Sequence, residues 1–308
     1  MTKGTWKDME TVRFTDTLTM DRIIHGHWRL LEWKLSKEEL LKFIESVIEI
    51  GVKTVDTADI YGGYSCEEAF GDALKLKKGL REKMTIVTKC GIMVPNKNRP
   101  QIESHHYDLT RKHIIKSAER SLKNLGTDYL DLLLIHRPSP FMDPAEVSQA
   151  FRELYESGKV RNFGVSNFKP SQFDLLSAYV DYPLVTNQVE ISPLHLKVFQ
   201  DGTIDNLMMK RITPMAWSPL AGGDIINGVK DREVNVRNTL LAIGEKYGEE
   251  RLDTLVYAFL LSHPARICPI VGSGKLNRIQ NAIDALKIKF NSEEWLTVYK
   301  ASLEKSLP

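Results

Sequence analysis

The feature of this sequence that most restricts its fold is a regular alternation between short β-rich runs and amphipathic helical segments. Each of eight apolar runs is followed by a segment with apolar residues at helical spacing, a pattern typical of βαβ units and a parallel sheet. Eight such units in about 250 residues match the size of a closed (β/α)8 barrel. The predicted strands are residues 23–28, the run ending at Asp56, and residues 85–89, 130–136, 162–166, 184–190, 214–218 and 267–271.

A doubly wound sheet is the main alternative, but no Gly-x-Gly-x-x-Gly follows the first predicted strand. The first helix has clear ends: Ser36 and Glu39 form a capping box, and Gly51 ends the segment. Residues 14–18 predict a small N-terminal hairpin, and residues 292–303 predict an extra C-terminal helix. No composition shift marks a domain boundary. We therefore predict an α/β fold, a (β/α)8 TIM barrel with an N-terminal hairpin and extra helices, in one domain over residues 1–308.

The overall composition is that of an ordinary globular protein. With 308 residues, 42% hydrophobic residues and a net charge of +2, nothing suggests nucleic acid or a membrane surface as a partner. The three cysteines have no metal-ligand spacing and fit a reduced compartment. Residues 1–10 are polar, without a signal core, and no apolar run approaches the roughly 20 residues of a membrane span. We expect a cytoplasmic, metal-free protein, a monomer or weak homo-oligomer.

Polar side chains gather where the predicted strands end. In a (β/α)8 barrel, the residues at the carboxyl ends of the strands carry the chemistry. Packing alone does not explain why these ends are polar while the strand interiors are rich in Ile, Val and Leu. The residues at these ends are Asp56, Lys89, His136, Ser166, Asn167, Gln188, Trp217, Ser218, Gly272 and Ser273.

Four of the polar residues can form a proton-delivery group. Asp56, Lys89 and His136 end consecutive strands, and Tyr61 lies on the loop after Asp56. We expect the Lys89 ammonium to lower the pKa of the Tyr61 phenol, and Asp56 to keep Lys89 charged. His136 would orient a substrate carbonyl or share the proton. Taken singly, Asp56 can cap a helix, Tyr61 can be a half-buried aromatic residue, Lys89 a surface cation and His136 a satisfied strand-end histidine.

The motifs that contain these residues resemble those of the aldo-keto reductase superfamily, in the order found in that family and from about residue 20 to residue 285. The resemblance implies a (β/α)8 barrel and NADPH-dependent carbonyl reduction, with Tyr61 as proton donor in a tetrad with Asp56, Lys89 and His136. The matching segments are Asp56-Thr57-Ala58-Asp59-Ile60-Tyr61-Gly62, Thr88-Lys89, residues 133–138, residues 158–167, residues 187–190 and Trp217-Ser218-Pro219-Leu220.

The resemblance also implies a cofactor site. Ser166, Asn167 and Gln188 resemble the residues that hold the nicotinamide carboxamide, and Trp217 stands where many members have a stacking tyrosine. Ser218, Pro219, Leu220 and Gly222 resemble the pyrophosphate segment, and we expect the loop at residues 223–235, with Lys230 and Arg232, to fold over it. Gly272, Ser273, Lys275 and Arg278 resemble a 2′-phosphate site, which favours NADP(H) over NAD(H). Against this, Gly272 replaces a lysine that is common in the family, and residues 280–282 fit its pattern poorly.

The substrate site is less defined. Trp28 is expected as a wall of the substrate pocket beside Tyr61 and His136, or else as a core residue. The loop at residues 90–108, with Met93, Arg99, His105, His106 and Tyr107, is either a substrate lid or a solvated loop. Two other functions compete with a carbonyl reductase: a nicotinamide-sensing binding or regulatory subunit with little turnover, and a Schiff-base enzyme with Lys89 as nucleophile.

Overall fold

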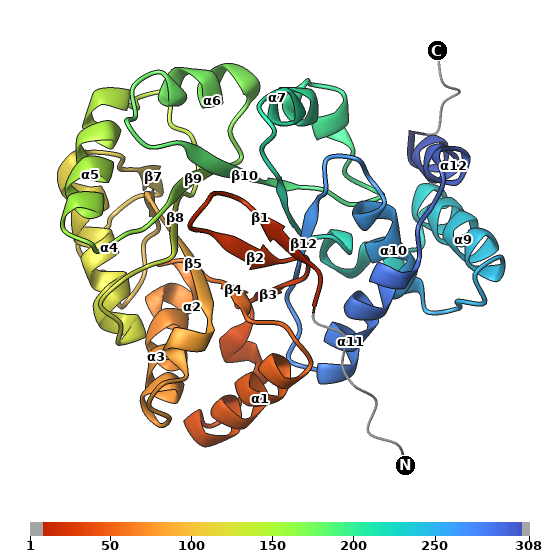
Figure 1. Ribbon diagram of the computed structural model, residues 1–308, viewed down its shortest axis with the longest axis horizontal. Helices are drawn as coiled ribbons and strands as arrows, with labels where there is room; N and C mark the ends of the chain where they lie inside the picture. The colour runs from red at the N-terminus through yellow and green to blue at the C-terminus, as the bar shows by residue number, and fades with distance from the viewer. Residues whose placement is uncertain (1–8, 304–308) are drawn as a thin grey trace.

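The computed structural model describes residues 9–303, so most of the polar N-terminal stretch lies outside the described part. Eight parallel strands close into a barrel in the order β10-β11-β12-β3-β4-β5-β8-β9, which confirms the predicted (β/α)8 fold (Figure 1). The barrel strands are β3 (Ile24–Gly26), β4 (Thr54–Asp56), β5 (Thr85–Cys90), β8 (Leu132–Ile135), β9 (Phe163–Ser166), β10 (Leu184–Glu190), β11 (Met215–Trp217) and β12 (Cys268–Val271).

Helices surround this barrel (Figure 1). The capping box that predicted the first helix is present, because Ser36 Oγ accepts from the Glu39 amide and the Glu39 carboxylate accepts from the Ser36 amide over 2.8 Å. The helices around the barrel are α1 (Lys37–Glu49), α3 (Cys66–Lys75), α4 (Arg111–Leu125), α5 (Pro144–Glu156), α6 (Pro170–Ser177), α7 (Thr203–Met209), α10 (Leu252–Leu261) and α11 (Leu276–Asp284).

Extra helices add to this ring, as expected. Helices α9 (Asp231–Glu245) and α12 (Ser292–Leu303) pack against each other at one side of the barrel (Figure 1). A short helix, α8 (Asp224–Asn227), precedes α9, and a compact turn, α2 (Tyr61–Tyr64), follows β4. Single 3₁₀ turns cover residues Leu30–Trp33, Arg81–Lys83, Lys197–Phe199, Ala221–Gly223 and Ala285–Lys287.

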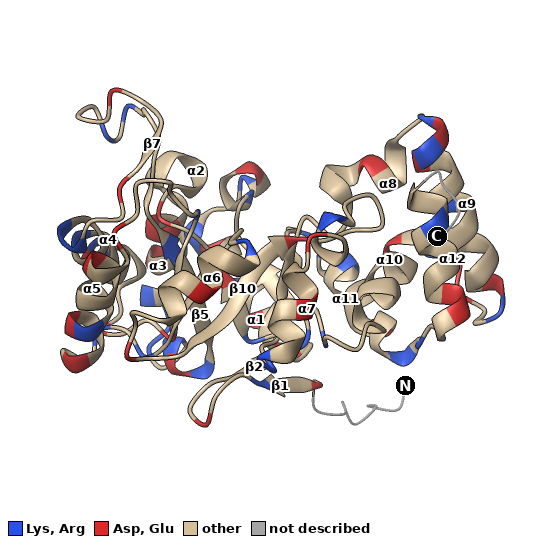
Figure 2. Ribbon diagram, turned by 90° about the horizontal axis from the view of Figure 1, so that it is seen from above, with Lys and Arg blue, Asp and Glu red and all other residues tan. Residues whose placement is uncertain are grey.

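The N-terminal hairpin closes the amino end of the barrel. Strands β1 (Thr11–Arg13) and β2 (Thr19–Asp21) pair antiparallel, and the predicted hairpin at residues 14–18 is their connecting turn. Val12, Leu18 and Met20 are buried in one cluster with side chains of the barrel strands. Figures 1 and 2 show the hairpin lying across this end. The carboxyl end is therefore the open end, where the polar strand-end residues gather.

None of the helices within residues 9–303 has the length and apolar character needed to cross a membrane.

Candidate active site

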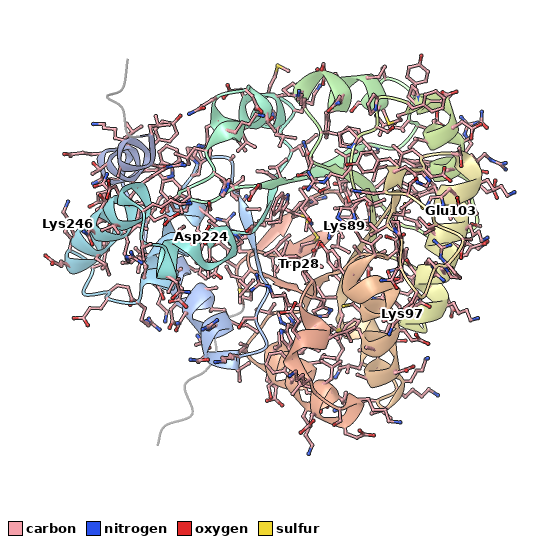
Figure 3. The ribbon with its side chains drawn as sticks, turned by 180° about the vertical axis from the view of Figure 1, so that it is seen from behind. Trp28, Lys89, Lys97, Glu103, Asp224 and Lys246 are labelled. Carbon is pink, nitrogen blue, oxygen red and sulfur yellow. The ribbon has the colours of Figure 1, made fainter. Side chains whose placement is uncertain are left out.

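The carboxyl ends of the strands surround a cavity of about 850 Å³. This volume lies within the range of about 300–1,000 Å³ that is typical of ligand pockets. Figure 3 views this end of the barrel, with Trp28 and Lys89 near its centre. The cavity is lined by these residues predicted from the sequence: Trp28, Asp56, Tyr61, His136, Ser166, Asn167, Gln188, Trp217, Ser218, Pro219, Leu220, Gly222, Gly272, Ser273 and Arg278.

Lys89 lies beneath this lining and is fully buried. All three N–H groups of its ammonium donate hydrogen bonds within the protein. Its Nζ atom donates to Asp56 Oδ2 over 2.7 Å, to the Thr57 carbonyl over 2.8 Å and to Tyr61 Oη over 3.1 Å. An ammonium has three protons to donate, so these bonds use all of them. Tyr61 Oη thus accepts a hydrogen bond from Lys89, and its own proton has no acceptor among residues 9–303. The phenol O–H is free to donate into the cavity.

The electrostatics of the Tyr61–Lys89 pair differ in one respect from the expectation. Burial raises the pKa of Tyr61 above its ordinary value; the Lys89 charge acts in the opposite direction, and the Asp56 charge raises the pKa further. The predicted lowering of this pKa is therefore wrong, because burial outweighs a cation that Asp56 already neutralises. Burial alone would lower the pKa of Lys89, but Asp56 and Tyr61 raise it. At neutral pH the pair is a protonated phenol beside an ammonium.

His136 is a neutral imidazole at the edge of the cavity. Burial, and then the positive charges of Lys89 and Arg137, hold its pKa well below 6.5. Its ring meets the Tyr61 ring edge-on, with centroids 5.9 Å apart, and Nδ1 has no hydrogen-bond partner among the described residues. A neutral imidazole keeps one N–H donor and one acceptor nitrogen. His136 can therefore hold a polar group of a ligand beside the Tyr61 hydroxyl without a net charge of its own.

A hydrogen-bonded chain connects the predicted nicotinamide residues. The Trp217 indole N–H donates to Asn167 Oδ1 over 3.0 Å, Asn167 Nδ2 donates to Ser166 Oγ over 2.7 Å, and Ser166 Oγ donates to the Gln188 carbonyl over 2.8 Å. Asn167 adopts φ 63°, a left-handed conformation that asparagine tolerates better than most residues. These side chains are therefore fixed in place at the cavity wall.

Gln188 makes a further contact that the sequence did not predict. Its Nε2 atom donates to Asp56 Oδ1 over 2.6 Å, on the carboxylate oxygen that Lys89 does not use. An amide carries two N–H donors and one oxygen acceptor. One donor is thus engaged, and the oxygen remains for a ligand.

The segment after β11 forms a tight turn that lines the cavity. Ser218 and Ala221 have φ of 52° and 50°, and Gly222 has φ 70°. The Ala221 amide donates to the Ser218 carbonyl over 2.8 Å, and the Gly222 amide donates to Ser218 Oγ over 3.0 Å. The prediction that residues 223–235 form a loop is wrong, because helix α8 and the start of helix α9 lie in this segment. Arg232 points away from the cavity and donates to the carbonyls of Ser302 and Leu194. The side chain of Lys230 is 82% exposed.

The predicted 2′-phosphate segment follows β12 at the carboxyl end of the barrel. Gly272, Ser273 and Arg278 line the cavity, whereas Lys275 is the N-cap residue of α11 and is not among the lining residues. Neighbouring side chains hold the segment in place. The His25 Nε2 atom lies 3.0 Å from the Ser273 carbonyl oxygen, and a Cβ on Gly274 would come within 2.5 Å of the Trp33 ring.

The structure also clarifies the loop at residues 90–108. Strands β6 (Ile92–Met93) and β7 (His106–Tyr107) pair antiparallel, and the loop stands above the barrel rim (Figure 2). Ile92 lines the cavity, whereas Met93, Arg99, His105, His106 and Tyr107 are not among the described lining residues. Lys97 and Glu103 of this loop lie toward the periphery in Figure 3. In this conformation the loop does not cover the cavity.

The loop instead contacts the turn that follows Tyr61. Asn98 Nδ2 donates to the Gly63 carbonyl over 2.8 Å and to Ser65 Oγ over 3.1 Å. The Tyr64 hydroxyl accepts from the Val94 amide over 2.8 Å. The turn needs such support, because Gly62, Gly63 and Tyr64 all lie in the left-handed region, with φ of 57°, 62° and 70°.

Several residues that line the cavity were missed from the sequence. A signal existed for Arg29 and Arg137, which directly follow the strand-end residues Trp28 and His136. Arg251, Asp253 and Tyr257 belong to α10 or precede it, far from any strand end, so the strand-end rule gave no signal for them. Within residues 9–303, no group of three or more His, Cys, Asp or Glu side chains is placed to hold a metal ion. The missed residues that line the cavity include Arg29, Ile60, Ile92, Arg137, Ile226, Asn227, Arg251, Leu252, Asp253 and Tyr257.

Comparison with known proteins is consistent with this geometry. The model of the aldo/keto reductase family matches residues 22–302. The oxidoreductase YcsN of Bacillus subtilis (strain 168) is 49% identical over 300 residues, which cover 97% of this chain and 100% of that protein. The 6-dehydroglucose reductase of Agrobacterium fabrum is 41% identical, with the same coverage of both chains. The solved structure of the thermostable aldo-keto reductase Tm1743 with the inhibitor epalrestat superposes with a TM-score of 0.79 at 26% identity, covering 95% of this chain and 100% of that one.

Proposed function

The chain belongs to the aldo/keto reductase family, and from this premise we propose that it is an NADPH-dependent oxidoreductase that reduces aldehyde or ketone carbonyls to alcohols. The observation that carries the proposal is the free O–H of Tyr61, held by Lys89 at the wall of a large cavity. A positioned acid of this kind protonates an oxygen on which negative charge develops.

In this proposal Tyr61 is the proton donor. Its raised pKa keeps the phenol protonated at neutral pH, and the Lys89 ammonium 3.1 Å away stabilises the phenolate that remains after proton transfer. Asp56 balances the charge of Lys89 and fixes its position through the 2.7 Å bond. The proton that Tyr61 would transfer is that of its O–H group, which donates no hydrogen bond to any acceptor in the described part of the chain.

His136 orients the carbonyl oxygen. It lies beside Tyr61, and burial together with two neighbouring cations keeps it neutral. A neutral donor polarises the carbonyl without becoming a second acid that competes with Tyr61. The two rings thus direct two donors to one substrate oxygen.

The remaining lining residues fit a dinucleotide. Ser166, Asn167, Gln188 and Trp217 would hold the nicotinamide, and Ser218, Pro219, Leu220 and Gly222 would hold the pyrophosphate. When bound, the cofactor supplies hydride to the carbonyl carbon. Gly272, Ser273 and Arg278 would hold a 2′-phosphate, whereas Lys275 does not line the cavity. Arg278 lines the cavity, and its guanidinium has no acceptor within residues 9–303, which supports NADP(H) over NAD(H).

A Schiff-base function for Lys89 is disfavoured by its environment. Imine formation needs a neutral amine, whereas Asp56 and Tyr61 raise the pKa of Lys89, and its side chain is fully buried. The substrate is proposed to be a small polar carbonyl compound, because the 41% identical relative is named for the reduction of an oxidised sugar.

A panel of aldehydes and ketones assayed with NADPH and with NADH in parallel tests the proposal. The expected result is NADPH oxidation with reactive aldehydes such as 4-nitrobenzaldehyde, at a higher kcat/KM than with NADH. Tight NADPH binding without turnover across the panel would instead identify a cofactor-sensing binding or regulatory subunit.

A further inference from the structure

Positive charge exceeds negative charge around the cavity. Two carboxylates line it, and both are engaged: Asp56 by Lys89 and Gln188, and Asp253 by the Asn281 amide over 2.9 Å. The arginines that line the cavity are Arg29, Arg137, Arg251 and Arg278.

Two of these arginines have a role already. Arg251 is held by protein acceptors, Glu249 at 2.7 Å and Asp284 at 2.9 Å. Arg278 lies in the segment proposed for the 2′-phosphate. Arg29 and Arg137 have no such role, and neither side chain has a carboxylate or any other hydrogen-bond acceptor among residues 9–303.

The two remaining arginines are fixed by aromatic rings. The Arg29 guanidinium lies over the Trp28 ring, 5.1 Å from its centroid, and the Arg137 guanidinium lies over the Trp217 ring at 5.6 Å. Both side chains are half-buried, and both rings line the cavity. Stacking on a ring orients a guanidinium while leaving its in-plane N–H groups for a ligand.

Both arginines follow strands that lie next to the strands carrying Asp56 and Lys89. Arg29 follows β3 and Arg137 follows β8, and between these strands lie β4 and β5, which carry Asp56 and Lys89. The two arginines therefore flank Asp56 and Lys89 along the barrel. The proposed pyrophosphate and 2′-phosphate segments follow β11 and β12, and β12 pairs with β3, so NADPH affinity must be measured beside substrate affinity.

We propose that Arg29 and Arg137 bind an anionic substituent of the substrate, so that this protein reduces carbonyl compounds that carry a carboxylate, sulfonate or phosphate group. A guanidinium matches such an oxyanion with two parallel hydrogen bonds. The inference rests on the proposed reductase function, since it names the substrate class of the same site. It gives the two arginines a specificity role and leaves proton transfer to Tyr61.

A matched pair of aldehydes tests this. 4-Formylbenzoate carries the charge, and its methyl ester lacks it while keeping the same carbonyl. The expected result is a kcat/KM for 4-formylbenzoate at least tenfold above that for the ester. Arg29→Gln and Arg137→Gln should each lower kcat/KM for the anion by about 10- to 100-fold, the cost of a lost hydrogen bond to a charged group, with little effect on the ester.

The controls separate charge recognition from structural damage. Arg29→Lys and Arg137→Lys keep the charge and should restore part of the loss for the anion. Arg152→Gln, on the outer helix α5, should leave both substrates unaffected. Equal kcat/KM values for acid and ester in the wild type, or an equal loss for both substrates in the Gln variants, would overturn the inference.

A binding measurement keeps the inference testable if the reductase function itself fails. Calorimetric titration with 4-(hydroxymethyl)benzoate in the presence of NADP⁺ should show binding that the Gln variants weaken by about tenfold or more, and the corresponding methyl ester should bind more weakly. NADPH affinity, measured by fluorescence, should stay unchanged in both variants. A weakening of NADPH binding in place of anion binding would assign the arginines to the cofactor phosphates and contradict the inference.

Discussion

Gln188 on β10 donates a 2.6 Å hydrogen bond to Asp56 on β4, across the mouth of the barrel. The Asp56 carboxylate thus accepts Gln188 on one oxygen and Lys89 on the other. A residue proposed to hold the nicotinamide is therefore bonded to the group proposed to deliver the proton.

Replacing Gln188 by leucine should affect both stability and turnover. The substitution leaves Asp56 Oδ1 buried without this donor, which costs about 1–3 kcal/mol of unfolding free energy. We expect kcat to fall along with cofactor affinity, because Asp56 no longer holds Lys89 in place. Chemical denaturation and steady-state kinetics measure the two effects. Gln149→Leu, at an exposed position on α5, is the control. An unchanged unfolding free energy in Gln188→Leu would show that the bond contributes little.

Asp59 should make stability depend on pH. Burial, and then the Glu67 charge, raise the pKa of Asp59 well above 3.8, and its Oδ1 has no hydrogen-bond partner among the described residues. The folded state then binds more protons than the unfolded state, so the contribution of Asp59 to stability is lost as the pH rises above about 4.

Asp59→Asn removes this effect. As the pH rises above about 4, the unfolding free energy of the variant should gain on that of the wild type. Denaturant titrations at several pH values give the two curves. Parallel curves for the two proteins would mean that Asp59 is ionised in the folded state throughout this range.

His136 should not titrate near neutral pH. Burial and the charges of Lys89 and Arg137 keep its pKa well below 6.5, so kcat should show no ionisation at that value. Arg137→Gln removes one of the two cations and should move the His136 pKa upward. NMR titration of the imidazole protons, assigned with His136→Asn, follows this directly. A wild-type His136 that titrates near pH 6.5 would contradict the described burial.

The loop at residues 90–108 should affect kcat, because it supports the turn that positions Tyr61. Asn98→Ala removes the contacts to Gly63 and Ser65 that hold the left-handed turn. We expect a several-fold loss of kcat with unchanged NADPH affinity, because the turn positions the proton donor and not the cofactor. Lys97→Ala, at the neighbouring exposed position, should retain wild-type kcat. Equal rates in all three proteins would mean that the loop does not position Tyr61.

The sequence was most informative about features that depend on a local pattern of residues. The eight strand–helix repeats predicted the barrel, and Ser36 with Glu39 predicted the start of α1, because both depend on residues close in sequence. The start of α9 was missed because its N-cap is Lys230, which is not a favoured cap; the Glu233 carboxylate accepts from the Lys230 amide instead.

The parts of the site that depend on distant residues were harder to predict. The Gln188–Asp56 bond joins residues 132 positions apart, and no local signal indicates it. The direction of the Tyr61 pKa shift was also predicted wrongly, since the sequence placed Lys89 beside Tyr61 but did not show how strongly burial acts on the phenol. The arginines stacked on Trp28 and Trp217 become visible only when the cavity is known.

The most direct test of the proposed function is the rate of NADPH oxidation with 4-nitrobenzaldehyde by Tyr61→Phe. The variant keeps the ring and removes the one O–H proposed to protonate the substrate. We predict that kcat falls by about 10²- to 10⁴-fold while NADPH still binds, with Tyr155→Phe on α5 as the active control. A Tyr61→Phe rate equal to that of the wild type would contradict the assignment of Tyr61 as proton donor.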